Sequence, residues 1–185
     1  YEETGELGME LNGGIKIFGG WSRGQDQRSF SIFARQQYGA NEVDYPLFAS
    51  RSYDSYQSFV LRNAGNDLLN SNMRDVTLTS LMEGSGLEIQ ANRPAVTYIN
   101  GEYWGFYNIR EKINEHFLAA KFNLDPEKIN ILERNGELIH GSNLSYINIY
   151  DFIANNSLVS DANYNQVTEK IDIENFIIYY VAQIY

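Results

Sequence analysis

The sequence predicts an α+β fold with a sheet-rich N-terminal half and a mainly helical C-terminal half. Two observations predict the sheet. Apolar residues alternate between turn glycines over residues 14–39, and an Asn-Gly pair separates two alternating runs over residues 95–111. A third observation predicts the helices, because most segments after residue 113 carry apolar residues at helical spacing. Strands followed by helices, without strict alternation, are typical of the α+β class.

Length and composition are those of one ordinary globular domain. The 185 residues suffice to bury a core, and the hydrophobic and charged fractions of 43% and 21% are usual. The net charge of −10 argues against general binding to nucleic acid or to anionic membrane surfaces, both of which require clustered Lys and Arg. It does not exclude a small phosphorylated ligand in a locally basic pocket. No apolar run approaches the roughly 20 residues that span a bilayer, so we expect no membrane span.

Some kinds of site are excluded by single residue types. The chain has no cysteine, which rules out disulfides, zinc–thiolate sites and a cysteine nucleophile. Its two histidines, His116 and His140, do not stand at a metal-ligand spacing, so we expect ordinary structural roles for them. The chain begins with Tyr1 rather than Met, and we therefore expect a processed or trimmed piece of its protein.

The first hairpin is predicted over residues 14–20 and 28–39. The first segment alternates and ends in two glycines, and the second follows as the partner strand. The connecting loop, residues 20–27, is long and polar for a hairpin, and long loops on rigid strands often carry function. Arg23 and Arg28 lie in and beside this loop. They indicate either a phosphate site or a plain turn with solvated arginines.

A strand, a turn and a helix are predicted next. Residues 59–67 resemble a strand that ends in a turn, and residues 68–84 place apolar side chains at steps of three or four. Asp67 is the candidate N-cap of this helix, and Gly84 is its candidate C-terminal stop.

The second hairpin turns at Asn100-Gly101, a pair that favours a two-residue type I′ turn. Such a turn fixes the pairing of the neighbouring residues: Ile99 with Glu102, Tyr98 with Tyr103, Thr97 with Trp104, and Val96 with Gly105. Gly105 has no side chain, so we expect another part of the chain to approach it closely.

The rest of the chain is predicted to be mainly helical. Helices are expected over residues 114–123, 146–155, 161–171 and 171–185, with turns and short strands over 125–141. Asn114 and Asp172 are the candidate N-caps of the first and last of these helices. The last helix is strongly apolar, so we expect it to be buried, and we expect the natural domain to continue beyond Tyr185.

Several of these stretches together resemble one protein family. They are GIKIFGGWSRG and RSFSIFARQQYG, FVLRNAGND, MRD, YINGEYWGFYNIREKINEHFL and DPEKINILE. In combination they resemble the CotH kinase family, named after spore coat protein H, in the form found in Bacteroides-type bacteria. The resemblance runs from about Gly14 to the C-terminus, and the segment YINGEYWGFYNIREKI is its most specific part.

The resemblance implies one partial domain, residues 1–185, of an atypical protein-kinase-like fold. A sheet-rich N-terminal lobe would cover about residues 1–110, and a hinge with the start of a helical C-terminal lobe about 111–185. It implies that the intact protein binds ATP with Mg or Mn and phosphorylates Ser or Thr of a protein substrate. The family's catalytic and metal-binding Asp and Asn lie soon after the helix that here ends at Tyr185. We therefore expect no catalytic and no metal-binding residue within this chain, and no phosphate transfer by the chain alone.

The resemblance also implies ATP contacts in the first loop. Gly20, Ser22 and Arg23 would cover the phosphates with backbone and side-chain donors. The family usually has a Lys entering the next strand, and the matching position here is Arg28. This is a departure, because Arg is wider and less adaptable than Lys although it can grip phosphate bidentately.

Glu111 is the candidate hinge residue, because it ends the second hairpin. By resemblance its carboxylate would accept a hydrogen bond from the adenine amino group or a ribose hydroxyl. The alternative is a solvated charge that pairs with Lys112 or Arg110.

Arg62 is a further candidate, in a polar cluster that spans residues 62–75. The functional interpretation is that Arg62 helps to organise the nucleotide site. The structural one is that it pairs with a carboxylate, and for Asp67 and Asp75 we favour such capping and bracing roles.

A second function class stays open beside the kinase. The chain is also consistent with a non-catalytic pseudokinase, serving as a binding module of a surface, spore coat or envelope. Arg28 in place of Lys, the acidic charge and the many aromatic residues favour this alternative. From the resemblance we expect a location in the bacterial cell envelope or outside the cell.

Overall fold

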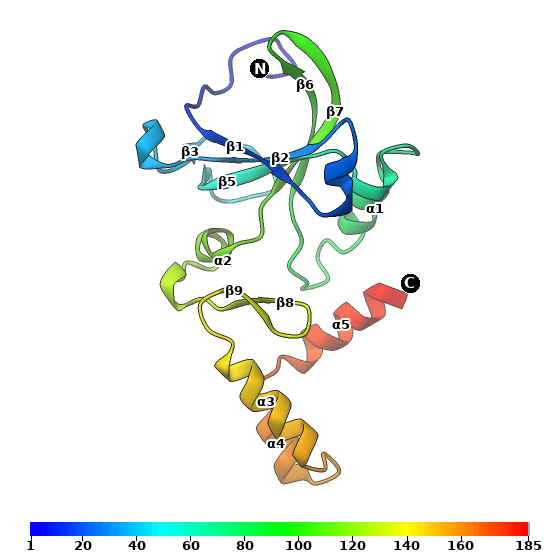
Figure 1. Cartoon of the computed structure of the whole chain (residues 1–185). Coiled ribbons are helices and arrows are strands. Elements are labelled where there is room, and N and C mark those ends of the chain that lie inside the picture. Colours follow the sequence, from blue (N-terminus) through cyan, green and yellow to red (C-terminus); the bar gives the residue numbers. More distant parts are fainter. Residues whose placement is uncertain (185) are drawn as a thin grey trace. The chain divides into compact units, whose positions relative to one another are not determined.

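The computed structural model describes residues 1–184, and it confirms the α+β class (Figure 1). The chain divides into two compact units. A sheet unit comprises Tyr1–Leu81 and Gln90–Leu124, and a helical unit comprises Met82–Ile89 and Asp125–Tyr185.

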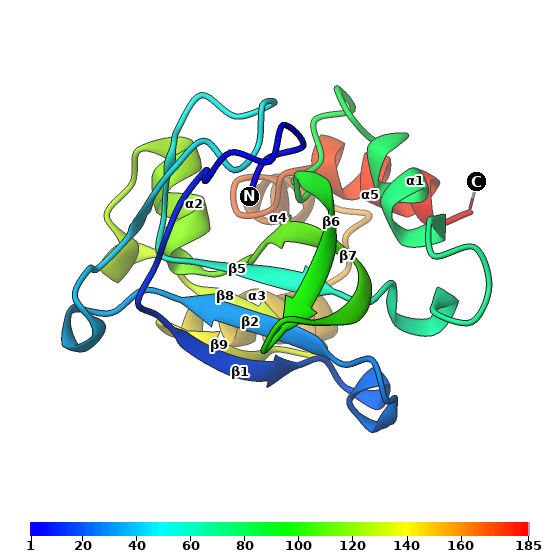
Figure 2. The same ribbon diagram turned by 90° about the horizontal axis from the view of Figure 1, so that it is seen from above.

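The sheet unit is built on five antiparallel strands in the order β1-β2-β5-β7-β6. Their bounds are β1 Gly14–Phe18, β2 Ser29–Phe33, β5 Ser58–Arg62, β6 Asn92–Ile99 and β7 Glu102–Glu111. Figure 2 shows β1, β2 and β5 side by side from above, with the β6–β7 hairpin crossing beside them. A small sheet of β3 (Val43–Asp44) and β4 (Ser55–Tyr56) and the helices α1 (Arg74–Ser80) and α2 (Glu115–Phe122) complete the unit.

The two faces of this sheet differ in character because neighbouring residues of a strand point to opposite faces. One face carries Phe59, Leu61 and Ile109, which pack into the apolar core with Leu47 and Phe48. On the other face the pairing aligns Lys16 with Ser31, Ser31 with Val60 and Val60 with Arg110. The second face is therefore largely polar, although Ser31, Val60 and Arg110 are themselves buried.

Both predicted hairpins are confirmed, but the second contains a bulge. Asn100 and Gly101 have φ values of 53° and 84°, as a type I′ turn requires, and Tyr98 lies opposite Tyr103 as predicted. Beyond that pair the register shifts by one residue. The further pairs were predicted wrongly, because Thr97 lies opposite Gly105 and Val96 opposite Phe106. Such a bulge depends on packing beyond the turn, which local turn chemistry does not specify.

The helix predicted over residues 68–84 is shorter than expected. A 3₁₀ turn occupies Gly65–Asp67, and α1 begins only at Arg74. Between them Asn72 takes a positive φ of 59°, which interrupts a continuous helix. Asp67 still serves as a cap, because its Oδ2 accepts hydrogen bonds from the N–H groups of Met73 and Arg74 at 3.1 and 3.0 Å.

α2 begins as predicted. The side chain of Asn114 accepts a hydrogen bond from the Phe117 N–H at 3.0 Å, and Asn123 closes the helix with a positive φ. The start of α2 lies by the start of β5, where Asn114 donates to Ser58 Oγ, whereas α1 follows the end of β5. The two helices therefore lie at opposite ends of β5 (Figure 2).

The helical unit contains a short hairpin and the three C-terminal helices. A 3₁₀ turn at Pro126–Lys128 precedes β8 (Ile131–Glu133) and β9 (Glu137–His140), and α3 (Leu144–Asn155), α4 (Asp161–Thr168) and α5 (Ile173–Ile184) follow. Asp172 caps α5 as predicted, since its Oδ1 accepts from the Asn175 N–H at 2.9 Å. Among residues 1–184 no helix has both the length and the apolar character needed to cross a membrane.

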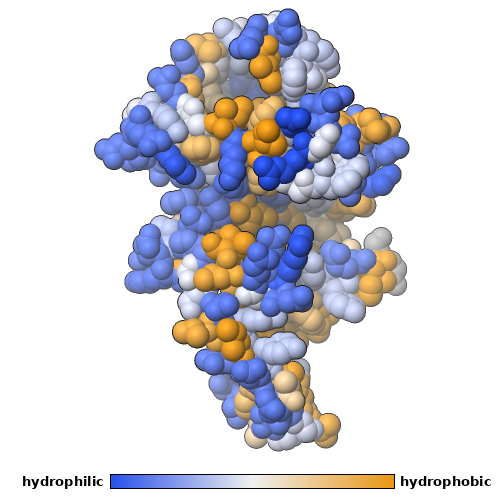
Figure 3. Space-filling view, viewed as in Figure 1, coloured by the Kyte–Doolittle hydropathy of each residue, from blue (hydrophilic) through white to orange (hydrophobic). Residues whose placement is uncertain are grey.

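The expectation that α5 is buried is wrong. Most of its large apolar side chains are about half exposed or more, with Phe176 at 57% and Ile184 at 68%, although Ile173 and Ile178 are partly buried. Apolar side chains (orange in Figure 3) also reach the surface among polar ones elsewhere in the chain. An apolar sequence shows that burial is favourable, but a packing partner must be present before the helix is buried.

Candidate functional site

The loop between β1 and β2 is held at its base by a buried polar network. Asn63, which follows β5, is 1% exposed. Its Oδ1 accepts from Ser29 Oγ at 2.7 Å and from the Gly65 N–H at 3.0 Å, and its Nδ2 donates to the Gln27 carbonyl at 2.5 Å. One side chain thus ties the loop, β2 and the end of β5 together, so the base of the loop is rigid.

A second set of contacts joins the loop to β7. Gln27 Nε2 donates to the Phe106 carbonyl at 2.7 Å, and the Tyr107 hydroxyl donates to the Arg28 carbonyl at 2.7 Å. A Cβ on Gly105 would lie 2.7 Å from Gln27 Cδ. The predicted close approach at Gly105 is therefore confirmed, and the approaching group is the loop itself.

The candidate phosphate residues of this loop lie above that base. Gly20 and Arg23 are exposed, whereas Ser22 is buried within a 3₁₀ turn at Trp21–Gly24. Arg28 is also exposed, and its Nε donates to the Gln25 carbonyl at 3.3 Å. The loop thus offers two exposed guanidinium groups, and their role in ATP binding stays a prediction.

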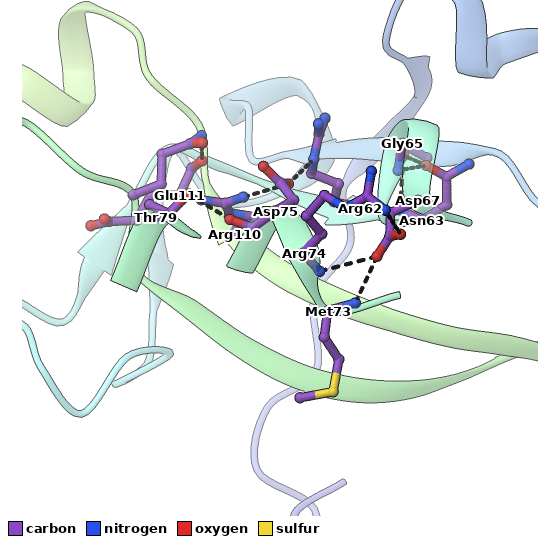
Figure 4. A network of polar contacts seen from close by, with 12 residues as sticks. Arg62, Asn63, Gly65, Asp67, Met73, Arg74, Asp75, Thr79, Arg110 and Glu111 are labelled. Atoms are coloured by element: carbon purple, nitrogen blue, oxygen red, sulfur yellow. Dashed lines mark hydrogen bonds and ion pairs between the residues drawn. The ribbon is translucent and has the colours of Figure 1, made fainter. Parts of the chain in front are cut away.

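Arg62, at the end of β5, is joined to α1 by an ion pair (Figure 4). Its Nε donates to Asp75 Oδ2 at 2.5 Å, and Arg110 of β7 donates from Nη1 to the same oxygen at 2.6 Å. Burial alone would raise the pKa of Asp75, but the charges of Arg110 and Arg62 outweigh it and hold the pKa below its ordinary value. The predicted pairing of Arg62 with a carboxylate is confirmed, and a role of Arg62 at a nucleotide site stays a prediction.

A second acidic residue lies near this ion pair, at the start of α1. Asp67 is 3% exposed, and its Oδ2 also accepts from Ser71 Oγ at 2.6 Å. Hydrogen bonds from Ser71 and from the Arg74 N–H hold the pKa of Asp67 below its ordinary value. Its Oδ1 is buried without a hydrogen bond among the described residues and lies 3.6 Å from Arg74 Nη2. Asp67 thus caps α1 with its side chain, although the N-cap position that was predicted for it belongs to Met73.

Three basic side chains share the polar face of the sheet, which we call the cationic face: Lys16, Arg62 and Arg110. Lys16 aligns with Arg110 across the sheet through Ser31 and Val60, and Arg62 follows Val60 by two residues on β5. Asp75 provides the carboxylate that contacts two of them. The cationic face therefore concentrates positive charge on a chain with a net charge of −10.

Lys112 follows the end of β7. Burial lowers the pKa of Lys112, Glu115 opposes the shift, and the charges of Lys16 and Arg35 add to the lowering. Guanidinium groups such as those of Arg62 and Arg110 suit phosphate, which Arg binds bidentately.

Glu111 lies on the opposite, apolar face of the sheet and is 1% exposed. Arg51 donates to its two carboxylate oxygens at 2.8 and 2.5 Å, the Ala91 N–H donates to Oε2 at 2.6 Å, and the Tyr53 hydroxyl donates to Oε1. Glu111 pairs with Phe59 in the sheet, three residues from Arg62 on β5, which is about 10 Å along a strand. The structure thus does not bring Glu111 together with Arg62.

Sequence reasoning missed Lys16 as a candidate, and it considered Arg110 only as a partner for Glu111. The alternation along β7 was the available signal, because it assigns Arg110 to one face and Glu111 to the other. Which strands are neighbours, and hence that Lys16 joins the same face, was not available from the sequence.

Among residues 1–184, no three His, Asp or Glu side chains gather into a group that could hold a metal ion.

Comparison with known proteins identifies one family. The family model described as CotH kinase protein matches residues 15–185. No protein with a curated description matches the chain significantly, and no solved structure does. Because the family match covers nearly the whole chain, the protein belongs to the CotH kinase family.

Proposed function

We propose that the sheet unit binds ATP with its phosphates at the cationic face, close to Arg62. In the intact protein this binding serves the transfer of phosphate to Ser or Thr of a protein substrate, with Mg or Mn as the accompanying ion. Membership of the CotH kinase family supports the proposal.

The observation that carries the proposal is the ion pair between Arg62 and Asp75. Protein kinases pair a Lys on the third strand with a Glu on the following helix, and both must be in place for phosphoryl transfer. Here β5 is the third long strand, α1 is the helix that follows, and a glycine-containing hairpin loop precedes both. This is an analogy of arrangement, supported by the basic side chains around it.

Each group has a distinct part in the proposed site. Arg62 binds phosphate oxygens with its terminal nitrogens, because its bond to Asp75 uses Nε. The loop residues Gly20, Ser22 and Arg23 cover the phosphates, and Arg28 adds charge at the loop's base. Positioning and charge stabilisation are the main tasks of a protein in phosphoryl transfer, and these groups supply both.

Calorimetric titration with ATP, in Mg and in Mn, tests nucleotide binding. We expect Arg62→Met to weaken binding by about tenfold or more. Lys170→Gln removes one positive charge from an exposed position outside the sheet and should bind ATP like the wild type. Equal affinity of the wild type and Arg62→Met, or no binding in either metal, would contradict the proposal.

Phosphate transfer is tested separately on the intact protein, with γ-labelled ATP and casein as a Ser-containing acceptor. Labelled casein supports the kinase function. ATP binding without any transfer would favour the non-catalytic binding module instead.

A further inference from the structure

We propose that Arg110 is a positioning residue that shares the negative charge of Asp75, so that Arg62 keeps a net positive charge for the phosphates while its Nε stays bonded to Asp75. The inference rests on the proposed ATP site and names a residue that acts through Asp75 rather than on the nucleotide. It begins from an unusual arrangement, in which two guanidinium groups donate to one oxygen of one carboxylate, Asp75 Oδ2 (Figure 4).

Arg110 is the fixed partner of this pair. Its side chain is 3% exposed, its Nη1 bonds Asp75 at 2.6 Å, and its Nη2 donates to Thr79 Oγ1 at 3.3 Å. Thr79 in turn donates to the Asp75 backbone carbonyl at 2.7 Å. Arg110 therefore holds both the side chain of Asp75 and the turn of α1 that follows it.

Arg62 is the more exposed partner. Its side chain is 32% exposed, and its hydrogen bond to Asp75 uses Nε, which leaves the terminal nitrogens directed elsewhere. Nη2 lies 3.1 Å from the position that a Cβ on Gly65 would take, so the glycine leaves room beside the guanidinium group.

The charges explain why the second arginine matters. If Arg62 were the only partner of Asp75, the carboxylate would cancel the charge of Arg62. With Arg110 in place, Asp75 is shared between two guanidinium groups. The three side chains carry one net positive charge, which favours an anion, whereas Arg62 and Asp75 alone would be neutral.

Titration of ATP with Mg into charge variants tests this role of Arg110 in ATP binding. We expect Arg110→Met to weaken ATP binding by about tenfold, and Arg110→Lys to retain most of the affinity. The double variant Asp75→Asn with Arg110→Met removes the competing carboxylate as well, and should return to within about threefold of the wild type. A purely structural role of Arg110 would not be rescued by a second change at Asp75.

Stability without nucleotide gives a second measurement that does not depend on ATP. Thermal unfolding should show that Arg62→Met is less destabilising than Arg110→Met, because Arg110 is almost fully buried and bonds Thr79 as well as Asp75, whereas the Arg62 side chain is 32% exposed. If Arg110→Met does not fold, Asp75→Asn alone decides, and we expect it to bind ATP at least as tightly as the wild type.

The outcomes separate this inference from the proposed function. Arg62→Met that binds ATP as well as the wild type contradicts the proposed site. In a second case Arg62→Met weakens ATP binding as expected, but Arg110→Met binds ATP like the wild type or the double variant is not rescued. Either result overturns the role of Arg110 and leaves the proposed site standing. Greater destabilisation by Arg62→Met than by Arg110→Met overturns it as well, with or without ATP.

Discussion

Replacing Glu111 by Gln tests whether the Glu111 carboxylate stabilises the fold or contacts the nucleotide. The structure indicates an anchor, because the buried carboxylate accepts two hydrogen bonds from Arg51, one from the Ala91 N–H and one from the Tyr53 hydroxyl. Gln has the same shape but only one accepting oxygen. Its NH₂ group would therefore face a donor of Arg51 or Ala91, and the positive charge of Arg51 would lose its counterion.

Breaking a buried ion pair by removing one partner costs about 3–5 kcal/mol. In a protein of this size each 1 kcal/mol lowers the melting temperature by about 2–4 °C, so Glu111→Gln should lower it by about 6–20 °C. Thermal unfolding followed by circular dichroism measures the change. Glu102→Gln is the matched control, because Glu102 is exposed at the hairpin tip and its loss should cost less than about 0.5 kcal/mol.

The opposite pattern would refute this reasoning. If Glu111→Gln melts like the wild type but binds ATP much more weakly, its carboxylate serves the nucleotide, as the family resemblance implies for the hinge. Loss of stability with unchanged ATP affinity in the folded variant would assign Glu111 to the fold.

Three further predictions concern the loop and the acidic limb of stability. Gly105→Ala should lower the free energy of unfolding in urea by about 1–3 kcal/mol, because φ at Gly105 is 145° and the new Cβ meets Gln27. Gly20→Ala is the control: the site has open space and a negative φ, so the change should stay within about 0.5 kcal/mol. Equal costs would refute the close approach. Asn63→Ala should lower the free energy of unfolding by about 3 kcal/mol, because it leaves buried polar groups on three segments without a hydrogen-bond partner. Proteolysis should then cut the β1–β2 loop faster than in the wild type, and an unchanged rate of cutting would show that other contacts hold the loop. The pKa of Asp75 is lowered in the folded state, so its contribution to stability is complete above about pH 4 and is lost as the pH falls through the folded pKa. The stability difference between the wild type and Asp75→Asn should therefore shrink as the pH falls below about 4, and a constant difference would contradict the pairing.

The candidate site was only partly accessible from the sequence. The arginines of the β1–β2 loop and Arg62 stood out because they are charges beside glycines and strand ends. Arg110 did not, because its neighbour Glu111 offered an apparent partner one residue away, and a strand directs the two side chains to opposite faces. The structure pairs Glu111 with Arg51, sixty residues earlier, and Arg110 with Asp75.

By itself the sequence determined what depends on residues close together in the chain. The Asn100-Gly101 turn, the Asn114 and Asp172 caps and the order of strands and helices are local, since backbone preference and hydrogen bonds within a few residues decide them. The tertiary structure decided what depends on partners far apart: the bulge opposite Thr97, the exposure of α5 and the assembly of the cationic face. These features follow from which strands become neighbours and which faces find a packing partner, and contacts between distant segments settle both.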